Sequence, residues 1–576
     1  MEEYRKQLLV YALENAIKHG GKAMVNSVFS KLLGSRPDLR PIARELLKLA
    51  EEVVSEVNLM SLNEQRELLA RLSETHVLVE EKVSSERRHL PPLPSAEERK
   101  VVTRFAPNPD FVLHLGSARP AILNYEYSRV YSGRFILRFE DTDPKTKAPM
   151  PEAYDIIRDD LKWLGIKWDE EYIQSLRMEI YYDHAKQLLK KGCAYVCKCP
   201  REAVSKYRTA GIRCSCAAQP EEYQLELWEK MLNGDFEEGE VTLRIKTDAS
   251  HPNPSVRDWV ALRIINTEQH PHPLTGNKYR VWPTYNFACA IDDRLMGVTH
   301  ILRGAEHEVN TLKQKYLYEH FGWKYPVAVH FGRLSIEGAI LSKSRMREGL
   351  RSGLFDSLDD PRLATLRALR RRGILPESIW ELIIQVGIKP SSAKISLENL
   401  YATNRKYLEP RANRYMFVPN PVKLRLKTGL KELVAKIPRH PSYPERGIRE
   451  IKLKVCNGIG EVYVPGNEVE NITPGKEIRL LGLANIRLLS DEEAEVLALG
   501  VEYAKSKSLP IIQWCPVMGA LNATIIVAKG NKVAVVEGVV EPGVKEVEVG
   551  MHAQFYRFGF TILENKEKLT FIYTHD

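Results

Sequence analysis

The sequence predicts a multidomain protein in which an α/β core lies between a helical N-terminal domain and a β-rich C-terminal region. Apolar residues recur at three- and four-residue spacing over residues 1–88, which is typical of amphipathic helices. A strand, a loop, a helix and a second strand follow between residues 100 and 140. From about residue 410, short alternating segments are separated by Gly, Pro and Asn, a pattern typical of β-barrels. At 576 residues the chain has room for about three to five domains.

The N-terminal helical prediction rests on segments such as LLVYALENAIKHG and ARELLKLAEEVVSEVNLM. The proline-rich segment RRHLPPLPSAEER follows, and prolines cannot occupy a helix interior. We therefore expect a helical domain with its linker over residues 1–95.

The α/β core begins with KVVTRF, a predicted strand, and continues to RFILRFE, a second one. Between them, SARPAILNYEYSRVY predicts a helix with a break or bend near Pro120. Such a βαβ unit implies a parallel sheet that binds ligands at the carboxyl ends of its strands. Further helices are expected near residues 151–163 and 177–191. After a mixed region, VWPTYNFACAIDDRLMGVTHILRGAEH indicates a return to the sheet, and residues 355–405 have a basic, helical pattern.

The composition excludes several classes of protein. No run of about 18 apolar residues is present, so no membrane span is expected, and the charged N-terminus lacks the apolar core of a secretory signal. We therefore expect a cytoplasmic protein. The net charge of +9 fits either a polyanionic partner or a solvated basic surface.

A cysteine cluster of the form CxC…CxC predicts a metal site. Its members are Cys197, Cys199, Cys214 and Cys216. In a cytosolic chain such a cluster favours zinc over disulfides, although reduced structural cysteines stay an alternative. Four thiolates would leave no open position, so the zinc would be structural. The other cysteines, at 193, 289, 456 and 515, are expected to be buried or to line a pocket.

Two loops are candidates for nucleotide binding, because neither GxxxxGK[ST] nor a strand followed by GxGxxG is present. In the first loop, HLGS opens a predicted helix whose N-terminus suits phosphate. His114 could donate to a phosphate oxygen, and Gly116 lets a base or ribose approach the backbone. In the second, LSKSR, Lys343 could stabilise a departing pyrophosphate. Either loop alone is also consistent with a chance turn or a solvated basic segment.

Together, HLGS and LSKS resemble the HIGH and KMSKS motifs of class I aminoacyl-tRNA synthetases. RFAPNP, LRFEDTDP, PTYNFA and GVTHILRG occur in the order found in the glutamyl/glutaminyl branch. Two positions depart from the motifs: Ser117 replaces the second histidine of HIGH, and Ile340 replaces the first lysine of KMSKS. The resemblance implies a Rossmann-like catalytic core over residues 96–195 and 281–350. It also implies an acceptor-stem insertion at 196–280, a helical connecting domain at 351–408 and anticodon-binding β-barrels at 409–576.

The resemblance also implies which residues form the site. His114 and Lys343 would be catalytic. The ATP-binding residues would be His114, Gly116, Ser117, Glu306, Ser342, Lys343 and Ser344. The substrate-binding residues would be Arg104, Ala106, Asn108, Glu140, Tyr285 and Arg303. Glu140 would hold the α-ammonium group, and the guanidinium of Arg303 favours glutamate over glutamine. A structural Arg104–Glu140 salt bridge and a purely structural Tyr285 stay open as alternatives.

The expected activity is ATP- and Mg²⁺-dependent ligation of glutamate to tRNA-Glu by a monomer. Charging of tRNA-Gln is left open. Thr142 and Asp143 would approach the terminal adenosine of the tRNA, and Arg411, Arg414 and Tyr415 would contribute to the anticodon site. The alternatives are a glutaminyl-tRNA synthetase, a small-molecule nucleotidyltransferase and an inactive tRNA-binding relative.

Overall fold

The computed structural model describes residues 2–18, 21–35, 43–62, 64–65, 68–69, 90–469 and 474–576. The chain forms two compact units, residues 1–90 and residues 91–576. The helical pattern expected over residues 70–88 falls outside the described residues. None of the helices within these ranges is both long enough and apolar enough to cross a membrane.

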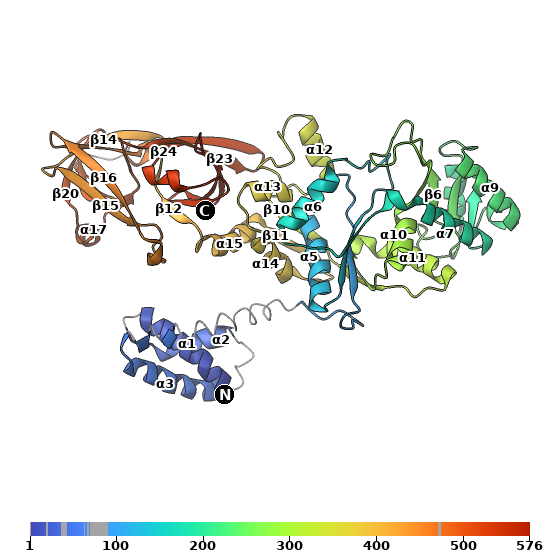
Figure 1. Ribbon diagram of the computed structural model, residues 1–576, viewed down its shortest axis with the longest axis horizontal. Coiled ribbons are helices and arrows are strands. Elements are labelled where there is room, and N and C mark those ends of the chain that lie inside the picture. Colours follow the sequence, from blue (N-terminus) through green and yellow to red (C-terminus); the bar gives the residue numbers. More distant parts are fainter. Residues whose placement is uncertain are drawn as a thin grey trace. The chain divides into compact units, whose positions relative to one another are not determined.

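The first unit contains the helices α1 (Glu2–Lys18), α2 (Val25–Ser35) and α3 (Ala43–Leu59), drawn in blue in Figure 1. Their apolar faces form one core, in which Leu8, Leu32 and Val53 are fully or almost fully buried. This arrangement follows the three- and four-residue spacing of apolar side chains.

The α/β core is built around parallel strands. Its elements are β1 (Val102–Phe105), α5 (Leu115–Val130), β2 (Arg134–Phe139), α6 (Ala153–Trp163), β3 (Glu170–Ile173), β8 (His300–Gly304), α11 (Glu308–Phe321) and β9 (Val327–Phe331). β1 pairs with β2 and β2 with β3, while β8 pairs with β9, all in parallel. The predicted βαβ unit is therefore confirmed. Helix α5 runs unbroken through Pro120, where the sequence predicted a break or bend.

A long-range seam joins the two parts of this core. The amide of Val102 in β1 donates to Thr299 Oγ1 at 2.8 Å, and the amide of Thr299, just before β8, donates to Val102 O at 3.0 Å. These residues are 197 positions apart in the chain.

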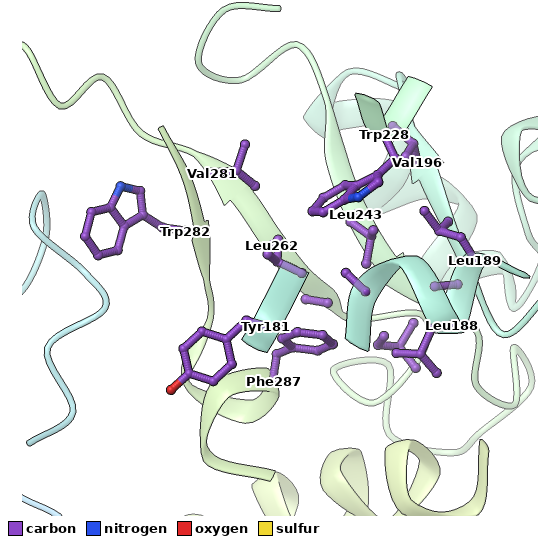
Figure 2. Close-up of a cluster of buried hydrophobic side chains, with 14 of the residues drawn as sticks. Tyr181, Leu188, Leu189, Val196, Trp228, Leu243, Leu262, Val281, Trp282 and Phe287 are labelled. Carbon is purple, nitrogen blue, oxygen red and sulfur yellow. The ribbon is translucent and has the colours of Figure 1, made fainter. Parts of the chain in front are cut away.

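The residues between β3 and β8 form an antiparallel sheet with its own helices. Its elements are α7 (Met178–Lys190), β4 (Ala194–Cys197), α8 (Arg201–Ala210), α9 (Glu221–Asn233), β5 (Thr242–Ile245), β6 (Val260–Ile264), β7 (Val281–Pro283) and α10 (Tyr285–Leu295). Figure 2 shows the core between this sheet and α7, α9 and α10, with Tyr181, Trp228 and Phe287 buried together. Val281–Pro283 pairs with β6, although the sequence placed residues 281–350 in the second half of the α/β core.

The connecting region contains β10 (Leu334–Glu337), α12 (Lys343–Arg351), α13 (Leu366–Arg371), α14 (Pro376–Val386), β11 (Ala393–Ser396) and α15 (Leu397–Leu408). The prediction of helices is correct for α13, α14 and α15. It missed β11, which pairs in parallel with β10. Ser396 is the last residue of β11 and the N-cap of α15, where it forms a reciprocal capping box with Asn399. The strand therefore ends where the helix begins.

Two sheets form the C-terminal region, coloured orange to red in Figure 1. The nine-stranded sheet contains β14 (Pro421–Lys427), β15 (Glu432–Pro438), β16 (Ile448–Cys456), β17 (Ile459–Pro465), β18 (Glu477–Leu480), β19 (Ala484–Leu488), β20 (Glu493–Ala498), β21 (Ile511–Ile512) and β22 (Cys515–Pro516). The seven-stranded sheet contains β12 (Asn413–Tyr415), β13 (Phe417–Pro419), β23 (Leu521–Lys529), β24 (Lys532–Val540), β25 (His552–Phe555), β26 (Gly559–Asn565) and β27 (Thr570–His575). Two short helices, α16 (Gly466–Val469) and α17 (Val501–Lys507), lie between these strands in sequence. Cys456, expected to be buried or to line a pocket, is exposed at the end of β16.

Candidate active site

A cavity of about 390 Å³ opens where β1, β2 and β8 end and α5 begins. This is the carboxyl edge of the parallel strands, where α/β folds bind ligands. The cavity brings together eight predicted site residues from four separate stretches of sequence. They are Arg104, Ala106, His114, Gly116, Glu140, Tyr285, Arg303 and Glu306.

His114 is the N-cap of α5, and its position fixes how the ring can act. Its Nδ1 accepts a hydrogen bond from the amide of Ser117 at 3.2 Å. Burial, and secondarily the nearby charge of Lys343, lower the pKa of His114 to about 4. The ring is therefore neutral near pH 7, and its proton is on Nε2 because Nδ1 is an acceptor. His114 can thus donate one hydrogen bond from Nε2 to an anionic ligand.

Arg303 is a buried guanidinium without a carboxylate partner. Its side chain is 5% exposed, and it forms no ion pair in the part of the chain that the structure describes. Nη2 donates to Thr311 Oγ1 at 2.7 Å and to Gln314 Oε1 at 3.0 Å, whereas Nη1 donates to the Tyr285 hydroxyl at 3.1 Å. Nε has no partner, and Nη1 carries a second N–H. These hydrogen bonds hold the guanidinium from one side. Its Nε, one N–H of Nη1 and its positive charge are available to a ligand.

Arg104 and Glu140 do not pair with each other, so the alternative of an Arg104–Glu140 salt bridge is wrong. Arg104 Nε donates to Asp293 Oδ1 at 3.1 Å. Arg138 bonds to both acids, with Nη1 to Asp293 Oδ1 at 2.7 Å and Nη2 to Glu140 Oε1 at 2.9 Å. Burial alone would raise the pKa of Asp293, but the two guanidinium groups hold it at about 2. Asp293 therefore stays ionised and fixes the position of both arginines.

Sequence reasoning missed Arg138 and Asp293, although each is at most 1% exposed beside the cavity. Through Asp293 and Arg138, Arg104 and Glu140 belong to one buried network of ion pairs. Burial also raises the pKa of Tyr285, so its hydroxyl is neutral and can donate a hydrogen bond.

A second cavity of about 550 Å³ adjoins the first. The two share Ala106, Glu140, Tyr285 and His307 as lining residues. Three further predicted residues, Asn108, Thr142 and Asp143, line only the second cavity. A ligand in the second cavity would therefore be separated from one in the first by the side chains of a few shared residues.

Of the LSKSR segment, Leu341 lines the first cavity, and the following four residues line neither cavity. Ser342 is the N-cap of α12, and Lys343 is the first helical residue rather than part of a loop. Lys343 Nζ pairs with Asp110 at 2.7 Å, and Arg347 pairs with the same carboxylate at 2.9 Å. Ser344 faces a separate surface hollow with Arg347. At the first loop, Ser117 contributes its amide to the His114 cap and is not a lining residue.

The four clustered cysteines meet in space. Their sulfur atoms all lie within 4.8 Å of one another, and the pairs Cys197–Cys214 and Cys199–Cys216 are each 3.7 Å apart. A tetrahedral zinc site with Zn–S bonds of about 2.3 Å requires sulfur–sulfur distances of about 3.8 Å. The donor set therefore fits a closed tetrathiolate zinc site.

The chain is similar to known proteins over its whole length. Residues 100–410 match the family described as "tRNA synthetases class I (E and Q), catalytic domain", and residues 412–504 match its anti-codon binding domain. The chain is 54% identical over 579 residues to a protein from Thermofilum pendens named glutamate–tRNA ligase, with both chains covered completely. Proteins of the same name from Pyrobaculum islandicum and Thermococcus kodakarensis are 53% and 50% identical, with at least 99% of each chain covered.

Proposed function

The chain belongs to the class I tRNA synthetases of the glutamate and glutamine family, and we propose that it is a glutamate–tRNA ligase. The observation that carries the proposal is the buried, unpaired guanidinium of Arg303 in the cavity at the strand ends. A neutral amide would leave this charge uncompensated, whereas a carboxylate neutralises it. Full-length similarity to glutamate–tRNA ligases supports the same substrate.

In the first step, the α-carboxylate of glutamate attacks the α-phosphorus of ATP, and pyrophosphate leaves. Arg303 and Tyr285 hold the side-chain carboxylate, and Glu140 holds the α-ammonium group. His114 donates from Nε2 to a phosphate oxygen at the N-terminus of α5, and Glu306 lies on the nucleoside side of the cavity. Mg²⁺ supplies further charge neutralisation on the phosphates. The protein thus works by positioning and electrostatics, and no side chain acts as a nucleophile.

Lys343 would act only after a movement, because it is paired with Asp110 and is not a lining residue. Nucleotide phosphates compete with that carboxylate for the ammonium group, since both are anions. We therefore expect α12 to shift when ATP binds, bringing Lys343 to the leaving pyrophosphate, with Ser342 and Ser344 beside it.

In the second step, the 2′-hydroxyl of the terminal adenosine attacks the acyl carbon, and AMP leaves. The second cavity would receive this adenosine, and the sharing of Glu140 and Tyr285 between the two cavities supports this assignment. Thr142 and Asp143 would contact the nucleotide there. The C-terminal sheets, with Arg411 and Arg414 at their start, would bind the anticodon.

The cysteine cluster would hold one structural zinc through Cys197, Cys199, Cys214 and Cys216. Bound zinc would tie β4 to the segment after α8 and so rigidify the insertion that meets the acceptor stem. One zinc per chain by elemental analysis is the expected result. We expect the enzyme to act as a monomer in the cytoplasm.

ATP–pyrophosphate exchange in the presence of tRNA tests the amino acid. Glutamate should be exchanged much faster than glutamine, and the opposite preference would indicate a glutaminyl enzyme. Aminoacylation of purified tRNA-Glu and tRNA-Gln, compared side by side, then tests whether one or both are substrates. Absence of exchange with either amino acid would favour an inactive relative.

A further inference from the structure

Arg244 is a buried guanidinium that the synthetase reaction does not use. It lies on β5 in the inserted sheet, and its side chain is 4% exposed. Among the described residues none forms a hydrogen bond or an ion pair with its guanidinium group, and its Nε is a buried donor without a partner. Burying a guanidinium without a negatively charged partner costs free energy, so we expect an anion to pair with it.

The strand register places Arg244 beside the cysteine cluster. In the antiparallel pair of β4 and β5, Tyr195 is opposite Arg244 and Cys197 is opposite Thr242. Cys197 and Arg244 are therefore diagonal neighbours on one face of the sheet, within reach of a long side chain. Arg244 and Cys214 also line the same small cavity, which confirms that they face the same space.

The other charged groups around this cavity do not neutralise Arg244. Asp258 pairs with Arg213 at 3.1 Å and accepts further hydrogen bonds from Tyr195 and Thr247. The remaining guanidiniums have backbone partners, with Arg208 donating to Pro254 O and Arg257 to His251 O. The residues that line the cavity therefore carry an excess of positive charge. Among them, Arg244 is the buried arginine whose guanidinium forms no hydrogen bond.

The enclosed space beside Arg244 is small. Its volume is about 20 Å³, which is room for about one water molecule, so a phosphate does not fit inside it. The neighbouring anion that needs no extra space is the cysteine cluster itself, because four thiolates around one divalent ion carry two net negative charges.

We propose that Arg244 is the counter-charge of the metal site: its guanidinium neutralises part of the negative charge of a zinc tetrathiolate at Cys197, Cys199, Cys214 and Cys216. This role makes Arg244 a positioning residue for the metal, and it rests on the zinc site proposed above. It has a distinctive consequence. The same arginine stabilises the zinc-loaded protein and destabilises the zinc-free protein.

The test compares full-length wild type with Arg244→Met, which keeps the bulk of the side chain and removes its charge. Zinc affinity is measured by competition with a chromophoric chelator, and thermal unfolding is followed with and without zinc. Outer-shell partners of metal sites typically contribute about 10–100-fold in affinity, so Arg244→Met should weaken zinc binding by that factor. It should also melt below wild type when loaded but not below it when zinc is removed.

Two further variants sharpen the result. Arg208→Met removes a positive charge from the lining of the same cavity. Arg208 is only half-buried and its guanidinium donates to the carbonyl of Pro254, so this variant should change the zinc affinity by less than about threefold. Arg244→Lys keeps the charge and should recover most of the affinity.

Each outcome has a separate meaning. If wild type binds no stoichiometric zinc, the zinc site itself is wrong. If wild type binds zinc and Arg244→Met binds it equally tightly, only the role of Arg244 is overturned. If instead the variant keeps zinc but weakens tRNA binding with a reduced salt dependence, Arg244 contacts RNA and the inference also fails.

Discussion

Replacing Arg303 by Met removes the buried cation of the proposed glutamate site while keeping an unbranched side chain. In the wild type, Arg303 is only 5% exposed, and its Nε and one N–H of Nη1 are available to the substrate. Leaving the substrate carboxylate buried and unpaired costs about 3–5 kcal/mol. At 1.4 kcal/mol per factor of ten, kcat/KM for glutamate should fall by a factor between about 10² and about 4 × 10³. Glutamine, which has no carboxylate to pair, should lose much less.

The assay is tRNA-dependent ATP–pyrophosphate exchange with glutamate and with glutamine. Arg294→Met is the matched control, because it removes an exposed charge from the end of α10 and should leave the glutamate constants within about twofold. Without ligand, Arg303→Met removes an uncompensated buried charge but also the hydrogen bonds to Thr311, Gln314 and Tyr285, so thermal unfolding must first show that the variant is folded. An unchanged kcat/KM for glutamate in a folded Arg303→Met protein would refute the pocket described here.

Three other perturbations have defined outcomes. Asp293→Asn should lower the free energy of unfolding by about 3–5 kcal/mol in urea titrations, because it leaves Arg104 and Arg138 without their shared counter-ion; equal stability would show that the bridge is unimportant. Because the pKa of His114 drops from 6.5 to about 4 in the folded state, the unfolded chain binds that proton more readily and stability falls as pH drops through this interval. The free energy of unfolding of His114→Gln should therefore fall less than that of wild type between pH 6.5 and 4, with a difference of about 3 kcal/mol at most. Identical pH profiles of the two proteins would contradict the lowered pKa of His114. Chelation or Cys214→Ser should remove the zinc and lower the melting temperature, and a Cys214→Ser protein that retains one tightly bound zinc would exclude the four-sulfur site.

Local patterns were sufficient for much of the fold. The change from period-two to helical spacing predicted β1, α5 and β2, and the C-terminal alternation predicted a region rich in strands. The cysteine cluster was also predictable, because its members are close in sequence. β11 was missed because a four-residue strand between helices has too few residues to show a period.

Within the site, the sequence indicated the ligand-facing residues but not what holds them. Arg104 and Asp293 are 189 positions apart, and no local pattern connects them. The one available indication was the acidic pair in YNFACAIDD, where two aspartates interrupt an otherwise apolar helix and are almost fully buried. Lys343 was predicted from its motif, but its pairing with Asp110 depends on tertiary contacts across 233 residues.

The seam between Val102 and Thr299 constrains the order in which a growing chain can fold. β1 and β2 leave the ribosome together, but the partner of β1 at Thr299 is made 197 residues later. At 5–20 residues per second, β1 waits about 10–40 seconds with one edge unpaired. The inserted antiparallel sheet is complete within that interval and can fold first. A nascent chain stalled before residue 299 would therefore expose a parallel-sheet edge, the kind of surface on which chaperones act and aggregation begins.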